Sequence, residues 1–200
     1  MSSSTAIFSA RRNFWSWLVH FNLPDQSSLS NNATPDEYAI RNALVARINA
    51  LQTNDIAYLA TYTWSSSNLT IGGAGPVLNA MDGALSRGAR VSFVVDNVVD
   101  TNTQYGGSNS LAMLSQRAGN PLILVQSAAA ANIMHDKLGV FQYGSTSRWF
   151  IVASWNFTAA ASASQWNIAL EMRSDKLFTA YTNEFAEFLA GRFNNSPSKS

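Results

Sequence analysis

Residues 133–158 read IMHDKLGVFQYGSTSRWFIVASWNFT, and this stretch carries most of the information about the fold and its chemistry. Two apolar runs surround a short turn, which is the pattern of a β-hairpin. His135 and Lys137 stand two apart on the first run, so on a strand they would point to the same face. A cationic amine beside an imidazole is unfavourable in an apolar core unless an anion lies opposite. The hairpin therefore predicts an anion-binding site.

His135, Lys137, Ser154 and Asn156 follow one another in an order and spacing that resembles the phospholipase D superfamily. The motif of that family is H-x-K-x4-D followed by G-S-x-N, and Ala153 stands here where the family usually has Gly. The resemblance implies an α/β fold of mixed α+β type, with a mixed β-sheet flanked by helices on both faces. It also implies a metal-independent phosphodiesterase that needs no cofactor and acts on a nucleic acid or a phospholipid.

Members of this superfamily build one active site from two such motifs, and this chain has one. The resemblance implies that one imidazole attacks phosphorus and forms a phosphohistidine, while the opposing imidazole protonates the leaving oxygen. His135 would be the nucleophile or the acid, and Lys137 and Asn156 would bind the oxygens on which charge builds up. The second motif would come from a two-fold homodimer, or from a missing second half to which residues 194–197 would be the linker.

Two positions differ from the family pattern. Gln142 stands where the family has its Asp, and Asn167 stands eleven residues after Asn156, where many members have Glu. Asn167 can accept a hydrogen bond from an imidazole but cannot stabilise an imidazolium by charge. Glu171 would share a strand face with Asn167, but four strand residues span about 13 Å, too far for a direct replacement. A degenerate, non-catalytic half that still binds phosphate therefore stays open as an alternative.

Other side chains near the motif have both a functional and a structural interpretation. Trp155 and Trp166 flank the motif residues and would line a substrate groove, with Ser154 and Asn167 as weaker substrate contacts. Packing in the core is the alternative for both tryptophans. His20 lies among aromatic residues, and we expect it to be packed or capping.

The composition narrows the remaining possibilities. With 200 residues, 46% of them hydrophobic, the chain can bury one core, so we expect a single domain over residues 1–193 and a flexible tail over residues 194–200. No cysteine and only two histidines are available, so we expect no metal site. No apolar run reaches the roughly 20 residues that cross a bilayer, so we expect no transmembrane segment. The Ser/Asn/Thr-rich, lysine-poor composition favours a secreted or periplasmic location over a cytoplasmic one, although no signal segment is visible.

Alternating helical and β-rich patterns predict a mixed sheet. The capping box formed by Thr34, Pro35, Asp36 and Glu37 predicts a helix over roughly residues 35–51. Further helices are predicted over residues 76–86, 108–117 and 175–192. Strands are predicted over residues 56–62, 91–95, 122–126, 133–141, 150–153 and 166–172.

Three functions fit this sequence. We favour a nuclease-like homodimer, because a single-motif chain of this size is similar to the small dimeric bacterial endonucleases of the superfamily. A phospholipase, either by itself or as one half of a two-motif enzyme, would need an apolar rim, for which residues 98–105 and Trp64 are candidates. The third function is the non-catalytic phosphate-binding half.

Overall fold

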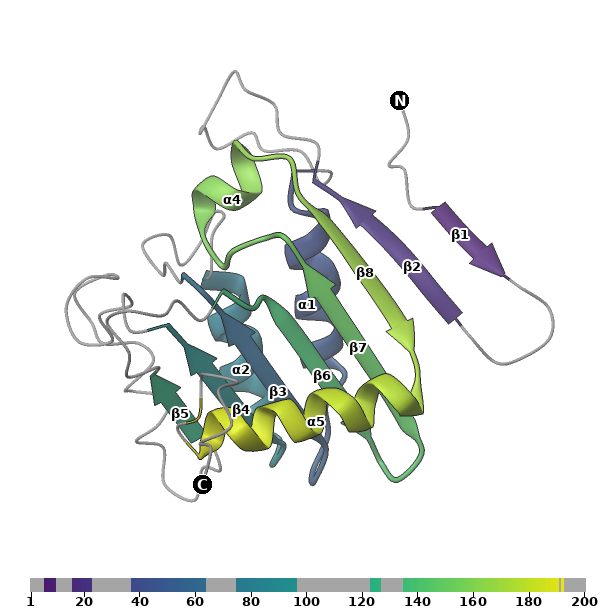
Figure 1. Ribbon diagram of the computed structural model, residues 1–200, viewed down its shortest axis with the longest axis vertical. Coiled ribbons are helices and arrows are strands. Elements are labelled where there is room, and N and C mark those ends of the chain that lie inside the picture. The colour runs from purple at the N-terminus through teal and green to yellow at the C-terminus, as the bar shows by residue number, and fades with distance from the viewer. Residues whose placement is uncertain are drawn as a thin grey trace, which may run out of the picture.

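The computed structural model describes residues 6–9, 16–22, 37–63, 75–96, 123–126, 135–190 and 192. Within these residues the centre of the fold is an eight-stranded sheet with the order β1-β2-β8-β7-β6-β3-β4-β5 (Figure 1). The strands are β1 (Ala6–Ser9), β2 (Ser16–Phe21), β3 (Ile56–Thr61), β4 (Arg90–Val95), β5 (Ile123–Gln126), β6 (Leu138–Tyr143), β7 (Ser147–Ala153) and β8 (Ile168–Arg173). The helices are α1 (Ala39–Asn49), α2 (Gly75–Ser86), α4 (Ala159–Ala163) and α5 (Asp175–Leu189).

The sheet combines a parallel part and an antiparallel part. Strands β3, β4 and β5 are parallel, whereas β6, β7 and β8 form an antiparallel meander in which β6 also pairs antiparallel with β3. Because of these directions, the ends of β3 and β7 lie at the same edge of the sheet as the beginnings of β6 and β8. Helix α4 joins β7 to β8 at this edge, which is the upper one in Figure 1. We call it the motif edge.

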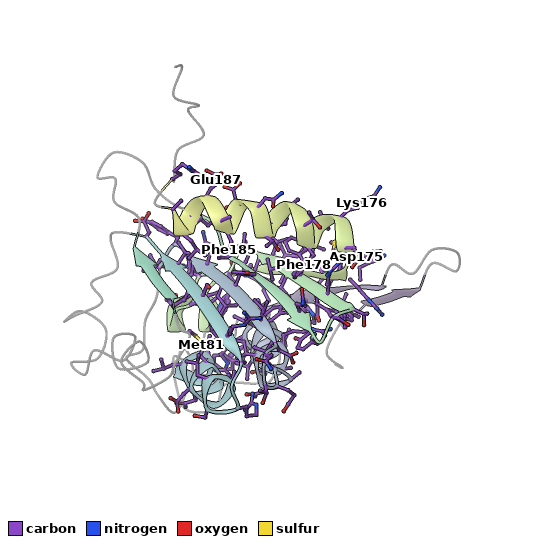
Figure 2. All side chains as sticks on the ribbon, turned by 90° about the horizontal axis from the view of Figure 1, so that it is seen from below. Met81, Asp175, Lys176, Phe178, Phe185 and Glu187 are labelled. Atoms are coloured by element: carbon purple, nitrogen blue, oxygen red, sulfur yellow. The ribbon has the colours of Figure 1, made fainter. Side chains whose placement is uncertain are left out.

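Helices cover both faces of the sheet. In the two views, α1 and α2 lie on one face and α5 crosses the other, near the end opposite α4 (Figures 1 and 2). The side chains of β3 alternate between these layers, since Ala57 and Leu59 belong to the core under α1 and α2, and Tyr58 and Ala60 to the core under α5. This alternation follows from the two-residue period of a strand.

Helix α5 is attached by an aromatic stripe. Phe178, Phe185 and Phe188 are buried against the sheet, and Figure 2 shows the first two pointing from α5 toward the strands. Burying an aromatic side chain of this size contributes about 1.5–3 kcal/mol. The helix begins after Ser174, whose Oγ accepts a hydrogen bond from the Leu177 amide at 3.3 Å.

The structure confirms the predicted fold class, a mixed sheet with helices on both faces. The helices predicted over residues 76–86 and 175–192 and the six predicted strands are present with shifted ends. Helix α1 begins at Ala39, later than predicted, and Thr34 of the capping box lies outside the described residues, as does the helix predicted over residues 108–117. Strands β1 and β2 and the short helix α4 were not predicted.

The motif strand differs from its prediction at its start. Strand β6 begins at Leu138, so His135 and Lys137 precede it instead of lying on it. Lys137 still pairs with the end of β7, because its carbonyl accepts a hydrogen bond from the Ala153 amide at 2.9 Å. His135 and Lys137 therefore belong to the segment that leads into β6, and the two-residue period of a strand does not determine the direction of their side chains.

Candidate active site

The sequence-predicted site residues come together at the motif edge. The register pairs Ala60 with Leu138, Leu138 with Val152, and Ala153 with Ala169. The residues just outside these pairs are His135 and Lys137 before β6, Ser154 and Asn156 after β7, and Trp166 and Asn167 before β8. Segments as far apart in sequence as Ala60 and Asn167 therefore meet at one edge.

Lys137 is the most strongly desolvated cation of this edge. It is only 5% exposed, and a small apolar pocket beside it is lined by Ile40, Leu44 and Ile151 among others. Burial lowers the pKa of the Lys137 ammonium, and the charge of Asp136 offsets this only in part. Nζ donates one hydrogen bond, to the His135 carbonyl at 2.8 Å. An ammonium carries three donors, so among the described residues two remain for an anion.

His135 presents an accessible imidazole at the same edge. Its side chain is exposed, and its ring lies 4.7 Å from the ring of Tyr62, centroid to centroid, with an angle of 53° between the planes. The Lys137 Nζ lies 5.5 Å from the same Tyr62 ring centre. Burial raises the pKa of the neighbouring Asp136 carboxyl, while Lys137 and His135 pull it down.

Asn156 contributes a side-chain amide whose oxygen, Oδ1, is buried. Its side-chain oxygen is buried and has no hydrogen-bond partner among the described residues. The turn that holds it is well fixed, because the Thr158 amide donates to the Asn156 carbonyl at 2.7 Å and Thr158 then caps α4. An amide oxygen only accepts hydrogen bonds, so the donor that Asn156 can offer to the oxygens of an anion is its Nδ2 group.

Asn167 and Ser154 link β7, α4 and β8 through hydrogen bonds. Ser154 Oγ donates to Asn167 Oδ1 at 2.8 Å and accepts from the Ile168 amide at 3.1 Å. Asn167 Nδ2 donates to the carbonyls of Ala161 at 2.8 Å and Gln165 at 3.3 Å. Both ends of the amide are used, and a carboxylate could not donate to these carbonyls. Asparagine at this position therefore has a structural role of its own.

The two candidate tryptophans occupy different environments. Trp155 is buried, its Nε1 donates to Ser162 Oγ at 3.0 Å, and its ring stacks on Phe157, so it packs in the core below the Asn156 turn. Trp166 is 68% exposed. Two residues further along the chain, Ile168 is 43% exposed, and it pairs across β8 and β2 with Phe21, which is 41% exposed. We call these three residues the exposed patch.

Gln142 lies far from the motif edge. It is four residues along β6 from Leu138, about 13 Å away, and its side chain donates to the Gly144 carbonyl in the hairpin turn. The carboxylate that holds this turn is Asp55, which accepts from the Gly144 amide at 2.7 Å and from the Gln52 amide at 2.8 Å. The departure from the family pattern at this position does not touch the candidate site.

His20 is packed, as predicted, and Glu171 is its partner. His20 Nε2 lies 2.7 Å from one oxygen of Glu171, and Arg47 Nε bonds the other oxygen. Burial alone would raise the pKa of Glu171, but the hydrogen bond from His20 and the charge of Arg47 lower it below its usual value. The Arg47 guanidinium also lies over the Trp149 ring, at 3.5 Å from its centre. Glu171 is thus fully engaged.

Tyr62 is a site residue that the sequence did not reveal. It directly follows β3, and only the pairing of β3 with β6 brings it to His135 and Lys137.

The described part of the chain holds no group of three potential metal ligands. It also holds no helix that is long and apolar enough to cross a membrane. Trp64 and residues 98–105 lie outside the described residues.

Residues 44–189 match the family described as "Cardiolipin synthase, PLD-like domain". This match covers most of the chain, so the chain belongs to that family of the phospholipase D superfamily, whose members act on phosphodiesters. No curated protein matches the chain significantly.

Solved structures agree with this assignment. NucT from Helicobacter pylori is 12% identical over 88% of this chain and 97% of its own, with a TM-score of 0.61. The phospholipase D family member Nuc from Salmonella typhimurium is 21% identical over 88% of this chain and 95% of its own, with a TM-score of 0.60. The phosphatidylserine synthase of Haemophilus influenzae is 11% identical, with a TM-score of 0.56, and the match covers 40% of that larger chain. At these identities the similarity establishes the fold.

Proposed function

We propose that this chain is a metal-independent phosphodiesterase that works through a phosphohistidine at His135. The observation that carries the proposal is the meeting of an accessible imidazole and a desolvated ammonium at the motif edge, where the turn that holds Asn156 also lies. Lys137 and Asn156 would bind the non-bridging oxygens, on which negative charge builds up in the transition state. Membership of a superfamily that acts on phosphodiesters supports the same reading.

The reaction has two displacement steps. A nitrogen of His135 attacks phosphorus, the bond to the leaving oxygen breaks, and that oxygen takes a proton from a second imidazole. Water then attacks the phosphohistidine, gives its proton to the second imidazole, and releases His135. Entering and leaving groups lie about 180° apart in an in-line displacement, so one imidazole cannot serve on both sides.

The second imidazole must come from another motif. The chain has two histidines, and the other one, His20, is bound to Glu171. We propose that a second copy of the chain supplies it across a two-fold axis. The exposed patch of Phe21, Trp166 and Ile168 supports this assembly, because it lies next to the motif residues and a facing copy would cover it.

The proposed substrate is a nucleic acid. The match to NucT and Nuc over nearly their full length supports this choice, together with the likeness to small dimeric endonucleases. A phospholipid is the second candidate, because the family description names cardiolipin synthase and the exposed patch offers an apolar rim beside the site.

The test is an assay of three substrates in excess EDTA with wild type and His135→Ala. Cleavage of bis(p-nitrophenyl) phosphate and of single-stranded DNA, lost in the variant, is the expected result. Turnover of phosphatidylglycerol vesicles without DNA cleavage would favour the phospholipid. No turnover of any substrate would leave a phosphate-binding half, and strong stimulation by a divalent ion after chelation would contradict the metal-independent mechanism.

A further inference from the structure

Tyr62 stands between the two charged members of the candidate site. Its ring contacts the His135 imidazole at 4.7 Å and lies 5.5 Å from the Lys137 Nζ, within the range of a cation–π interaction. Lys137 closes the group by donating to the His135 carbonyl. The three residues therefore form one cluster, although Tyr62 follows β3 and the other two precede β6.

The backbone on both sides of Tyr62 is tied to the Asn156 turn. Thr61 Oγ1 donates to the Thr63 carbonyl at 2.9 Å, across Tyr62. The Phe157 amide, next to Asn156, donates to the Thr63 carbonyl at 3.2 Å and approaches Thr61 Oγ1 at 3.4 Å. The ring position is thus fixed by the same segment that carries the amide of the site.

Among the described residues, no carboxylate forms a hydrogen bond with the His135 imidazole that would fix its orientation. Asn167 spends both ends of its amide on Ser154, Ala161 and Gln165, and Glu171 is bound by His20 and Arg47. Within the described part of the chain, the contact with the Tyr62 ring is the only ring contact of the His135 imidazole, and Asp136 acts on it by charge alone.

We infer that Tyr62 is a positioning residue that orients the His135 imidazole and holds the Lys137 ammonium beside it. The inference rests on the proposed function. The ring blocks one side of the imidazole and so limits its rotation, and its negative face favours a cation on either neighbour. This matters during turnover, because the imidazole that acts as the acid starts as an imidazolium. The ring does part of the work that an orienting carboxylate does in other sites.

The kinetic test compares Tyr62→Leu with Tyr62→Phe. The phenylalanine variant keeps the ring, so its kcat should stay within about threefold of wild type, whereas the leucine variant should lose about tenfold or more in kcat. Tyr58→Leu is the matched control, since Tyr58 lies on β3 too but packs on Phe185 under α5. It should lower the melting temperature and leave kcat within about twofold. Wild-type kcat in Tyr62→Leu, or equal losses in the leucine and phenylalanine variants, would overturn the inference.

A second readout does not depend on turnover. The Tyr62 ring current should shift the NMR signals of the His135 imidazole protons away from random-coil values in wild type and in Tyr62→Phe. In Tyr62→Leu the signals should move back. Unchanged His135 signals in Tyr62→Leu would overturn the inference. If wild type shows the shift but cleaves no phosphodiester, the proposed function fails while the positioning role of Tyr62 stands.

Discussion

The two histidines of this chain each lie beside a cationic side chain, and their surroundings differ in one respect. His20, on β2, shares the carboxylate of Glu171 with Arg47 in the interior of the fold. His135, at the motif edge, contacts the same Tyr62 ring as the buried ammonium of Lys137, and the carboxyl of Asp136 acts on both by charge. In the first group one carboxylate bonds to both neighbours, whereas in the second the charge of Asp136 offsets the burial of the Lys137 ammonium only in part.

This difference separates a structural group from a candidate site. A buried ion pair with all partners present supports the fold, and removing one partner leaves an uncompensated charge. A desolvated cation whose burial is offset only in part by a nearby carboxylate costs stability, and such costs gather at functional sites. Substitutions in the first group should therefore change stability, and those in the second should change activity.

The largest expected effect is that of His135→Ala. Because His135 is the proposed nucleophile and its side chain is exposed, kcat should fall by at least about 10³-fold, with a change in the free energy of unfolding below about 0.5 kcal/mol. His20→Ala is the matched control, with kcat within about threefold and a loss of about 1–3 kcal/mol in urea unfolding. Similar activity losses in both variants would remove the distinction between the two groups.

Lys137→Met should separate activity from stability at the motif edge. Without the ammonium the oxygens of the substrate lose a donor, so kcat/KM should fall by about 10²–10³-fold. The free energy of unfolding should not decrease, because burial disfavours the charged lysine, as its lowered pKa indicates. A clear loss of stability in thermal unfolding, with activity retained, would make Lys137 a structural residue.

Glu171→Gln should show the opposite behaviour. It leaves Arg47 and His20 without a carboxylate, so we expect a loss of about 2–3 kcal/mol in the free energy of unfolding at pH 7, with kcat little changed.

The pH dependence of this loss follows from the lowered pKa of Glu171. A depressed folded-state pKa gives stability that is complete above the unfolded value of about 4.5 and is lost as pH falls through the folded value. The difference between wild type and Glu171→Gln in urea unfolding should therefore narrow below about pH 4.5. A difference that stays constant down to pH 3 would mean that the carboxylate charge is not what stabilises the group.

The smallest expected effect concerns the exposed patch. If a second copy covers Trp166, then Trp166→Ser should weaken dimer formation by about tenfold in sedimentation, with the melting temperature of the subunit nearly unchanged. Lys176→Ser, an exposed position on α5, is the control and should leave the dimer intact. A wild-type chain that is monomeric and fully active would contradict the assembly itself.

The sequence predicted the parts of the site that are encoded locally. The spacing of His135, Lys137 and Asn156 around a hairpin indicated that these residues belong to one site, and the hairpin of β6 and β7 brings their segments to one edge. The order of helices and strands likewise indicated the fold class.

The remaining features depend on tertiary contacts that no local pattern contains. Tyr62 joins the site only because β3 pairs with β6, and Asn167 is explained only by the carbonyls around it. From the sequence, Gln142 replaces an Asp of the family motif, but β6 places it near the hairpin turn, at the end of the strand opposite the motif edge. Strand β2 was hidden because its aromatic residues lack a clear alternation of polar and apolar side chains.

The central claim is that His135 forms a covalent bond to phosphorus, and trapping the intermediate tests it most directly. Wild-type protein is mixed with a ³²P-labelled diester, quenched in base during turnover, and digested for mass spectrometry. We predict a label that is stable in base and labile in acid, located on His135, absent from His135→Ala and unaffected in His20→Ala. A label that persists in His135→Ala, or turnover of the diester without any label on a histidine, would contradict the account.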